Sequence, residues 1–360
     1  MWPYWFLFLL PALMAISHTK QLISRNAKWS FHWWLTFTLL VLMIGLRHEV
    51  GGDWYNDWQA VTGVRAPGAT VLLEDVINRS DIGYSLLIWI VNAFGLDVYT
   101  LDVLSAIPFT WGLIVFCREQ PRPWLALVVS VPYLIMVVAM GYTRQSVAIG
   151  FSMLGLVALS RGNIFRFVIL LAFASAFHKS AVILIPLALL AGTKRKLLTL
   201  IWVALATFLL FVLMLQESVD GLVKGYLDAK YESQGAGIRV AMNAVPAFLF
   251  LWLRNRFVMP PRDRVFWTWM SIGAFAFMGL LAISPSSTAV DRVALYWIPL
   301  QLFVLSRLPN ALGPRVGNNK VWVYAVVAYC GLIHFVWLMY ADTAFAWLPY
   351  QFYPWVWLWH

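Results

Sequence analysis

Long apolar segments alternate with short polar ones along the whole chain. Most of them hold about 15 to 20 residues with almost no charge, the length that an α-helix needs to cross a bilayer. A β-barrel would instead show apolar and polar residues in alternation. The pattern predicts an all-α, polytopic membrane protein with about twelve transmembrane helices. The predicted spans are 2–16, 30–46, 101–117, 124–141, 143–159, 163–177, 180–192, 197–215, 239–253, 265–283, 293–307 and 321–340.

Residues 82–95 form another apolar segment, about as short as 180–192. Segments of this length are more often interfacial or re-entrant than spanning. If 82–95 does not cross and 180–192 does, 17 of the 26 Lys and Arg residues lie on one side, with only two of the 16 Asp and Glu residues. Cytoplasmic loops are rich in Lys and Arg. We therefore predict that 82–95 is a short interfacial or re-entrant outer helix and that both termini are on the outer side.

The apolar segments follow one another without a soluble insertion. We expect residues 1–360 to form a single polytopic transmembrane domain, with outer loops 47–100 and 216–238 and an outer aromatic tail, 341–360, along the membrane interface. The N-terminal segment has no basic residue before its apolar run, so we expect a retained helix rather than a signal peptide.

Composition agrees with this fold class and excludes some functions. Hydrophobic residues make up 62% of the chain and charged residues 12%, against roughly 25% charged residues in soluble domains. The cytoplasmic loops account for the net charge of +10, so nucleic acid is not expected as a partner. Cys117 and Cys330 lie in or beside apolar runs, where a structural disulfide is not expected.

Several catalytic and nucleotide-binding motifs are missing from the sequence. It has no Walker motif, no His-Glu-x-x-His, no Cys/His cluster and no Gly-x-Ser-x-Gly. We therefore expect neither a cofactor nor a metal. Asp53 and Asp57 could in principle share a divalent cation, but their spacing alone is weak evidence.

The densest polar segment runs from Gly45 to Trp58, directly after the apolar run 30–46. It opens the longest outer loop of the predicted topology. Other polar residues stand at the outer ends of predicted helices, where an anionic ligand at the membrane surface would meet them. Arginine suits phosphate oxygens because its planar guanidinium presents five donors. The candidates are Arg47, His48, Glu49, Asp53, Asp57, Arg144, Gln145, His178, Arg239, Asp291 and Arg292.

Each candidate also has a purely structural interpretation. Arg144 could extend from a helix end to the lipid headgroups, and Arg292 could pair with the neighbouring Asp291. His178 could be a hydrogen-bonded turn residue, and Asp53 could cap a turn. Arg47 could likewise pair with Glu49, and Arg239 could meet only lipid headgroups. Tyr296 could be a core residue, and Trp54, Tyr55 and Trp58 could be interface anchors.

Five segments, in their order and spacing, resemble the EpsG family of bacterial exopolysaccharide polymerases, which is related to the Wzy-type polymerases. They are GLRHEVGGDWYND (45–57), DIGYSLLIWIVNAFG (81–95), YTRQSVAIGF (142–151), FASAFHKSAVILIP (173–186) and DRVALYWIPLQ (291–301). No single segment is highly specific, but together they cover most of the chain. Trp58 departs from the family pattern and keeps its aromatic character.

The resemblance implies a glycosyltransferase. Such an enzyme transfers a growing glycan from undecaprenyl pyrophosphate to a sugar hydroxyl of an incoming lipid-linked repeat unit. The reaction takes place on the outer face of the bacterial cytoplasmic (inner) membrane, in the synthesis of exopolysaccharide, capsule or O-antigen. The expected partners are the lipid-linked donor and acceptor and membrane lipids, with a chain-length regulator and a flippase as further candidates.

For this reaction we assign roles to the polar candidates. Arg144 and Arg292 would neutralise the pyrophosphate leaving group, with Arg47 as a third charge and Gln145 as a further substrate contact. Asp53 is the first candidate for the general base, because the glycines before it would let a sugar approach closely. The further assignments are His178 and then Glu49 as alternative bases, and Trp54, Tyr55 and Trp58 as a stacking platform for sugars.

Three other functions compete with polymerisation. A flippase for the same lipid-linked sugar would need charges along a path through the membrane, whereas the polar candidates gather at the outer face. A ligase that moves finished glycan shares the donor chemistry, and the sequence does not exclude it. An acyltransferase would need its histidine near a cytoplasmic acyl donor, and His178 is predicted at an outer turn.

Overall fold

The computed structural model describes residues 1–17, 29–62, 81–186, 235–284, 287–314 and 319–359. These residues form helices, and none of them belongs to a β-strand apart from one isolated bridge between Arg47 and Phe352. The predicted helix 197–215, most of 180–192 and nearly all of the loop 216–238 lie outside the described residues.

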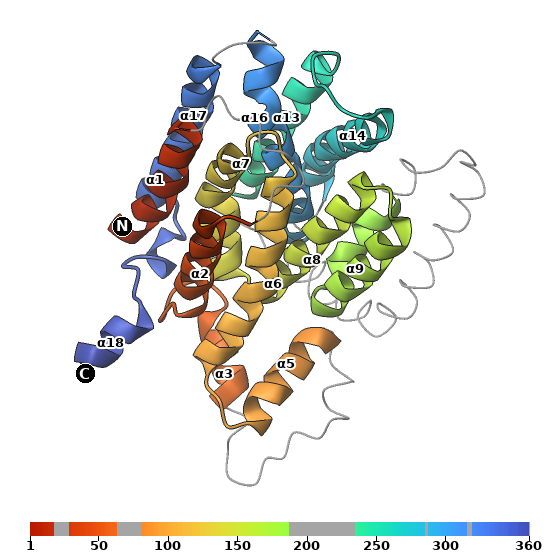
Figure 1. The fold of residues 1–360 in the computed structure, drawn as a ribbon. Coiled ribbons are helices and arrows are strands. Elements are labelled where there is room, and N and C mark those ends of the chain that lie inside the picture. Colours follow the sequence, from red (N-terminus) through yellow and green to blue (C-terminus); the bar gives the residue numbers. More distant parts are fainter. Residues whose placement is uncertain (18–28, 63–80, 187–234, 285–286, 315–318, 360) are drawn as a thin grey trace.

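The predicted apolar runs are helical throughout the described part (Figure 1). The first helices are α1 (Trp2–Ser17), α2 (Phe31–Gly45), α3 (Trp54–Thr62), α5 (Ile82–Ala93), α6 (Val98–Arg118), α7 (Pro123–Ser130), α8 (Thr143–Ser160) and α9 (Ile164–Phe177). They are followed by α13 (Ala236–Leu253), α14 (Pro261–Ile283), α15 (Ser287–Ala294), α16 (Ile298–Leu312), α17 (Lys320–Tyr340) and α18 (Tyr353–Trp359).

Four helices of the described part are long and apolar enough to cross a membrane: α6, α13, α14 and α17. Other apolar helices, such as α1, α2 and α9, are shorter. The chain is therefore an all-helical membrane protein. The total of twelve spans and the side on which the termini lie stay predictions.

Among the predicted spans that the structure describes in full, two are not single α-helices. The run 124–141 starts as α7 and continues as a π-helix, Val131–Ala139, and the run 293–307 is divided between α15, a 3₁₀ turn (Leu295–Trp297) and α16. A proline stands at the start of the π-helix and another at the start of α16. Proline has no N–H to donate, so a regular α-helical bond pattern cannot run unbroken through either position.

Glycines lie where α2, α6 and α8 approach one another. A Cβ added to Gly112 of α6 would lie 2.1 Å from the Gly150 carbonyl oxygen of α8, and one added to Gly45 of α2 would lie 2.6 Å from Val103 of α6. Small residues allow backbones to pack this closely in membranes. These contacts hold α6 closely against α2 and α8, and the first turns of α6 and α8 carry residues that surround the candidate site.

This packing predicts a stability difference between two alanine substitutions. Gly112→Ala should lower the melting temperature of the purified protein in detergent, because overpacking typically costs about 1–3 kcal/mol. Gly279→Ala is the matched control, since an added Cβ in this part of α14 has no atom within 4 Å. We expect the control to be neutral or slightly stabilising. Equal melting temperatures for the two variants would contradict the close approach.

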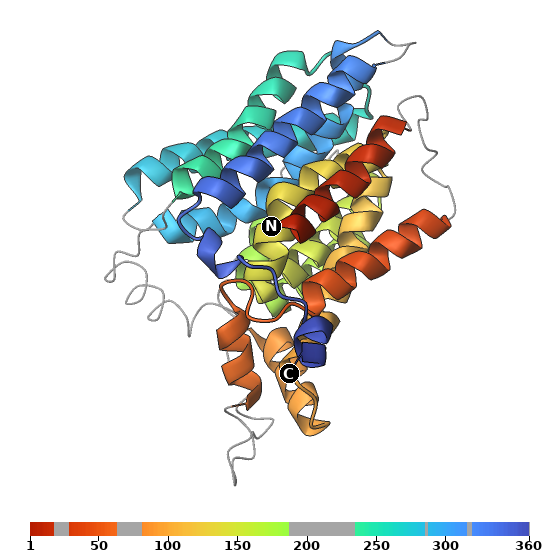
Figure 2. The ribbon, with the colours of Figure 1, turned by 90° about the vertical axis from the view of Figure 1, so that its left-hand side faces the viewer.

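Helices α3, α5 and α18 lie together at one end of the bundle, as Figure 1 and the rotated view in Figure 2 both show. Helix α5 packs there against α3, α6 and the end of α9, and the idea that 82–95 does not cross stays a prediction.

The C-terminal tail packs against the polar segment at this same end. Three main-chain hydrogen bonds of 2.8–3.0 Å join residues 346–353 to residues 46–51. Trp347 is buried and donates from Nε1 to the Met136 carbonyl oxygen (2.8 Å). The Tyr4 hydroxyl in the first turn of α1 donates to the Trp347 carbonyl oxygen (2.7 Å). The tail is thus packed into the fold around the polar segment. Its sequence predicts only a position along the membrane interface.

Candidate active site

The polar segment 45–58 is a tight turn followed by α3, whereas the sequence suggested a glycine-rich loop. Gly51 has a φ of 96°, and a Cβ there would lie 1.8 Å from the Met140 carbonyl oxygen. The Asp53 N–H donates to the Gly141 carbonyl oxygen (3.1 Å). The glycines therefore let this turn approach the turn before α8, and the idea that they make room for a sugar loses its basis. Their effect is to fix Asp53 beside the start of α8.

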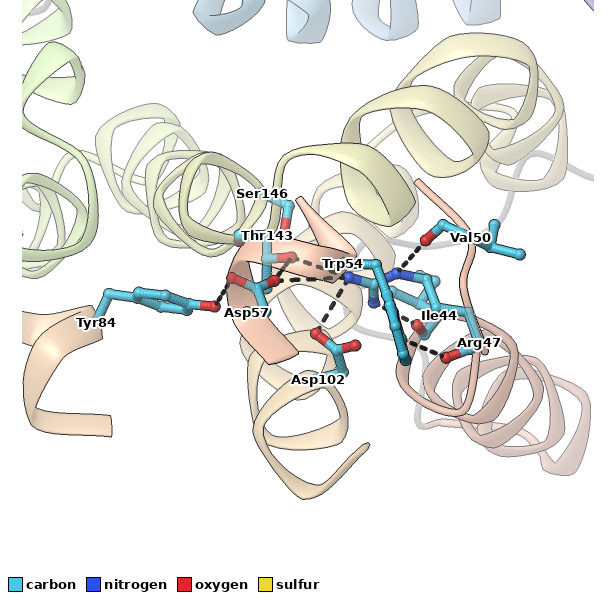
Figure 3. Close-up of polar contacts among 9 residues, drawn as sticks. All are labelled: Ile44, Arg47, Val50, Trp54, Asp57, Tyr84, Asp102, Thr143 and Ser146. Carbon is cyan, nitrogen blue, oxygen red and sulfur yellow. Dashed lines mark hydrogen bonds and ion pairs between the residues drawn. The ribbon is translucent and has the colours of Figure 1, made fainter. Parts of the chain in front are cut away.

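Arg47 is fully buried at the centre of the polar segment (Figure 3). Its Nε and Nη1 groups donate to the carbonyl oxygens of Val50 (3.1 Å) and Ile44 (2.7 Å). Its Nη2 group donates to Asp102 of α6 (3.1 Å) and to the Thr143 hydroxyl of α8 (2.9 Å). Arg47 joins the end of α2 to α6 and α8. Because protein acceptors occupy its guanidinium, we no longer assign it to the leaving group.

Asp57 lies next to Arg47 in the same buried network (Figure 3). Its carboxylate accepts hydrogen bonds from the hydroxyls of Tyr84 on α5 (2.6 Å) and Thr143 (2.7 Å). Burial, aided by the nearby Asp53 charge, raises the pKa of Asp57 to about 6. This network fastens α3 and α5 to the start of α8.

Arg144 lies one residue after Thr143 and is partly open to solvent. Its side chain is 41% exposed and pairs with Asp81, at 2.9 Å, just before α5. The guanidinium also lies over the Tyr84 ring, 5.9 Å from its centroid. Arg144 is thus held in place by its contacts with Asp81 and Tyr84, and the rest of its side chain is accessible to solvent. These contacts distinguish it from a freely extended surface arginine.

Arg292 lies on α15 and does not pair with its neighbour Asp291. The Asp291 carboxylate forms a bidentate ion pair with Arg239, whose Nε and Nη2 atoms lie 2.8 and 2.7 Å from its two oxygens. The Arg292 guanidinium instead lies over the Tyr142 ring (5.3 Å to the centroid), and its carbonyl oxygen accepts a hydrogen bond from Gln145. Gln145 therefore ties α15 to the start of α8, three residues after the Tyr142 ring that Arg292 covers.

Asp53 lies in the field of both arginines. Burial raises the pKa of Asp53, and the charges of Arg144 and then Arg292 act against that rise. The backbone N–H of Thr143 also donates to the carboxylate. A half-buried carboxylate with a raised pKa is a better proton acceptor than an ordinary aspartate.

His178 lies at the end of α9, next to the same two arginines. Its Nδ1 is 3.2 Å from the hydroxyl of Tyr296, which is buried as expected. Burial, with Arg292 and Arg144 nearby, lowers the pKa of His178 to about 3. An imidazole with so low a pKa is a weak proton acceptor, because desolvation and two positive charges oppose its protonation. Asp53 is the stronger candidate for the base.

The remaining candidates form a second group around α3. Glu49, Trp54, Tyr55 and Trp58 line a cavity of about 340 Å³, together with His48, whose Nδ1 is 2.6 Å from the Tyr99 hydroxyl. Glu49 has a φ of 52°, a strained conformation for a residue other than glycine and one that often marks a functional site. Since Glu49 belongs to this cavity, it is a weaker candidate for the base than Asp53.

The structure thus places most of the predicted site residues in two groups. The first, the arginine site, consists of Asp53, Arg144, His178 and Arg292, with Gln145 joining α15 to α8 beside it. The second, the aromatic cavity, is lined by His48, Glu49, Trp54, Tyr55 and Trp58. Sequence analysis missed the residues that hold the arginine site in place. Asp102 had a visible signal, because an acid in the first turn of an apolar span needs a partner. The others, which had no such signal, are Asp81, Tyr84 and Thr143.

The arginine site has the parts that a group transfer from a phosphate ester or anhydride requires. Arg144 and Arg292 can stabilise an anionic leaving group, and Asp53 can accept a proton from a hydroxyl nucleophile.

Comparison with known proteins identifies a family for the chain. The model of the EpsG family matches residues 30–352, which include both groups of site residues. No curated protein and no solved structure gives a significant match.

Proposed function

The chain belongs to the EpsG family, and from this premise we propose that it polymerises lipid-linked oligosaccharide repeat units during exopolysaccharide synthesis. The donor is a growing glycan on undecaprenyl pyrophosphate, and the acceptor is a sugar hydroxyl of the next lipid-linked unit. The arginine site faces the outside of the cytoplasmic membrane, as the distribution of charged loops predicts.

The observation that carries the proposal is that Asp53 lies within electrostatic reach of two arginines. Arg144 and Arg292 belong to different helices, and both act electrostatically on the Asp53 carboxylate. The two cations suit the charge of a pyrophosphate, and the carboxylate near them suits a neutral hydroxyl that must lose a proton. A site for binding phosphate alone would gain nothing from the carboxylate.

The reaction follows from these positions. The acceptor oxygen attacks the anomeric carbon of the donor glycan, and its proton passes to Asp53. The bond from that carbon to the pyrophosphate oxygen breaks, and undecaprenyl pyrophosphate leaves with the electron pair. Arg144 and Arg292 stabilise the charge that develops on the leaving group. Trp54, Tyr55 and Trp58 provide a platform for the sugars.

Asp53→Asn is expected to abolish chain growth while leaving the binding of lipid-linked substrate unchanged. Asp53 acts as a base only when it is ionised, so the wild-type rate should rise with pH through the raised pKa of Asp53. The residual turnover of the variant should not show this rise with pH. The check is the pH profile of chain elongation by purified protein in nanodiscs.

Folding can be monitored separately in this experiment. A carboxyl whose pKa is raised in the folded state stabilises the fold at low pH and loses that contribution as pH rises through the folded pKa. Asp53→Asn should therefore melt no lower than wild type at neutral pH. Unchanged chain growth in a folded Asp53→Asn protein would move the base to His178 or Glu49.

Deletion of the gene tests the proposed function as a whole. A strain without the polymerase should carry at most one repeat unit on its surface lipid. Long polymer retained on its carrier lipid would identify a ligase instead. For a flippase, the purified protein would relocate lipid-linked oligosaccharides between leaflets without lengthening them.

A further inference from the structure

The aromatic cavity lies between α3, the turn before it and the start of α6. Its size, about 340 Å³, falls within the range of small-ligand pockets. Trp54 and Trp58 line it from one face of α3, one helical turn apart. Tyr55 and Trp58 are 56% and 43% exposed, so two aromatic rings are open to a ligand.

The charged side chains that line the described part of the cavity are carboxylates, and His48 is the one further titratable group with a ring nitrogen there. Glu49 and Asp97 line it, and among the described residues no lysine or arginine does. Asp97 also caps α6, where its Oδ1 atom accepts hydrogen bonds from the N–H and hydroxyl of Thr100. The charge is opposite to that of the arginine site, although Trp54 of the cavity directly follows Asp53 in the chain. A pyrophosphate is therefore repelled by the cavity and attracted to the arginines.

The cavity walls are held by contacts within the protein. The Trp54 indole N–H donates to the Arg47 carbonyl oxygen (3.2 Å), which anchors that ring to the buried network. Tyr99 stacks on Tyr353 of α18 with ring centroids 3.6 Å apart. The C-terminal tail thus supports one wall of the cavity.

We infer that this cavity binds a sugar ring without acidic groups, as the glycan subsite of the polymerase, an inference that rests on the proposed function. Sugar rings present apolar C–H faces that stack on aromatic rings, and hydroxyl edges that donate to carboxylates. A uronic acid or a phosphorylated sugar would meet Glu49 and Asp97 with like charge. The cavity thereby selects the sugar and also orients the substrate, with its neutral part on α3 and its anionic part at the arginines.

Binding to an oligosaccharide array tests the inference. Full-length protein in nanodiscs is applied to neutral and uronic-acid oligosaccharides. Wild type should bind members of the neutral set and none of the uronic-acid set. Trp58→Ala and Tyr55→Ala should each weaken binding by about tenfold, the effect of truncating an aromatic anchor. Trp357→Ala, on an exposed ring of α18 outside the cavity, is the matched control and should bind as wild type does.

A charge substitution sharpens the test. Glu49→Gln combined with Asp97→Asn removes both acidic groups and keeps a good helix cap, since asparagine caps as well as aspartate. This variant should gain binding to uronic-acid oligosaccharides. Absence of binding to every neutral probe, equal wild-type binding to both sets, or unchanged binding in both aromatic variants would overturn the inference.

The proposed function can fail independently of the cavity. If neutral sugars bind as expected but a strain without the gene still makes full-length polymer, the cavity stands and the polymerase assignment falls. If Arg144→Ala loses polymer but the aromatic variants bind sugars as wild type does, the polymerase stands and the cavity assignment falls.

Discussion

Alanine at Arg144 or at Arg292 is expected to abolish long polymer while the protein stays at its normal level in the membrane. Each guanidinium lies within electrostatic reach of Asp53, and neither is enclosed by protein acceptors in the way that Arg47 is. Removing one preorganised donor that faces developing charge reduces turnover by about 10²–10³-fold. The measurement is the chain length of surface glycan in a complemented deletion strain, together with elongation by the purified variants.

Two further variants separate a specific effect from a general loss of positive charge. Arg166→Ala removes an exposed arginine in the first turn of α9, at the opposite end of that helix from His178, and should leave polymer unchanged. Arg144→Lys keeps the charge and loses the fork of donors, so it should recover only part of the activity. Full-length polymer from both Arg144→Ala and Arg292→Ala would refute the arginine site.

Replacing Arg47 by methionine should produce the largest loss of stability in the chain. Both members of the Arg47–Asp102 pair are completely buried, and the bond between them is 3.1 Å long. Removing one partner of a buried pair leaves the other charge without compensation, which costs about 3–5 kcal/mol. We expect a much lower melting temperature in detergent and little folded protein in the membrane.

The double variant Arg47→Met with Asp102→Asn tests the cause of that loss. If the uncompensated Asp102 charge is responsible, the second substitution should restore part of the stability. Equal melting temperatures for the single and double variants would show that the other Arg47 hydrogen bonds carry the effect. Activity is a poor measure here, because the same network positions Asp53 and α3.

The two groups of residues give the site a consistent division of work. In the proposed reaction, the arginine site binds and releases the anionic leaving group, and the aromatic cavity receives a neutral part of the glycan. Asp53 would serve both, since it precedes the helix that carries the cavity rings and lies within electrostatic reach of the two arginines. The network of Arg47, Asp57 and Thr143 keeps this arrangement rigid, which preorganised catalysis requires.

The sequence by itself determined the elements and the end of the bundle at which the polar residues gather. Apolar runs and breaks in them are local properties, so the helices of the described part could be predicted from composition and length. The exceptions were α7 and α16, where prolines interrupt the regular pattern, and α3, whose short amphipathic sequence resembled a loop. Arg144, Asp53 and Arg292 were recognisable because polar groups are rare in such a chain and stand out at helix ends.

Only the tertiary structure decided which of these residues act together. Arg47 and Arg144 look equivalent in sequence, but burial among carbonyl and carboxylate acceptors makes the first a structural residue and partial exposure leaves the second free to meet a ligand. The pKa of His178 and the partner of Asp291 depend on groups more than thirty residues away. Such properties arise from desolvation and from charges brought together by folding, and no local pattern encodes either.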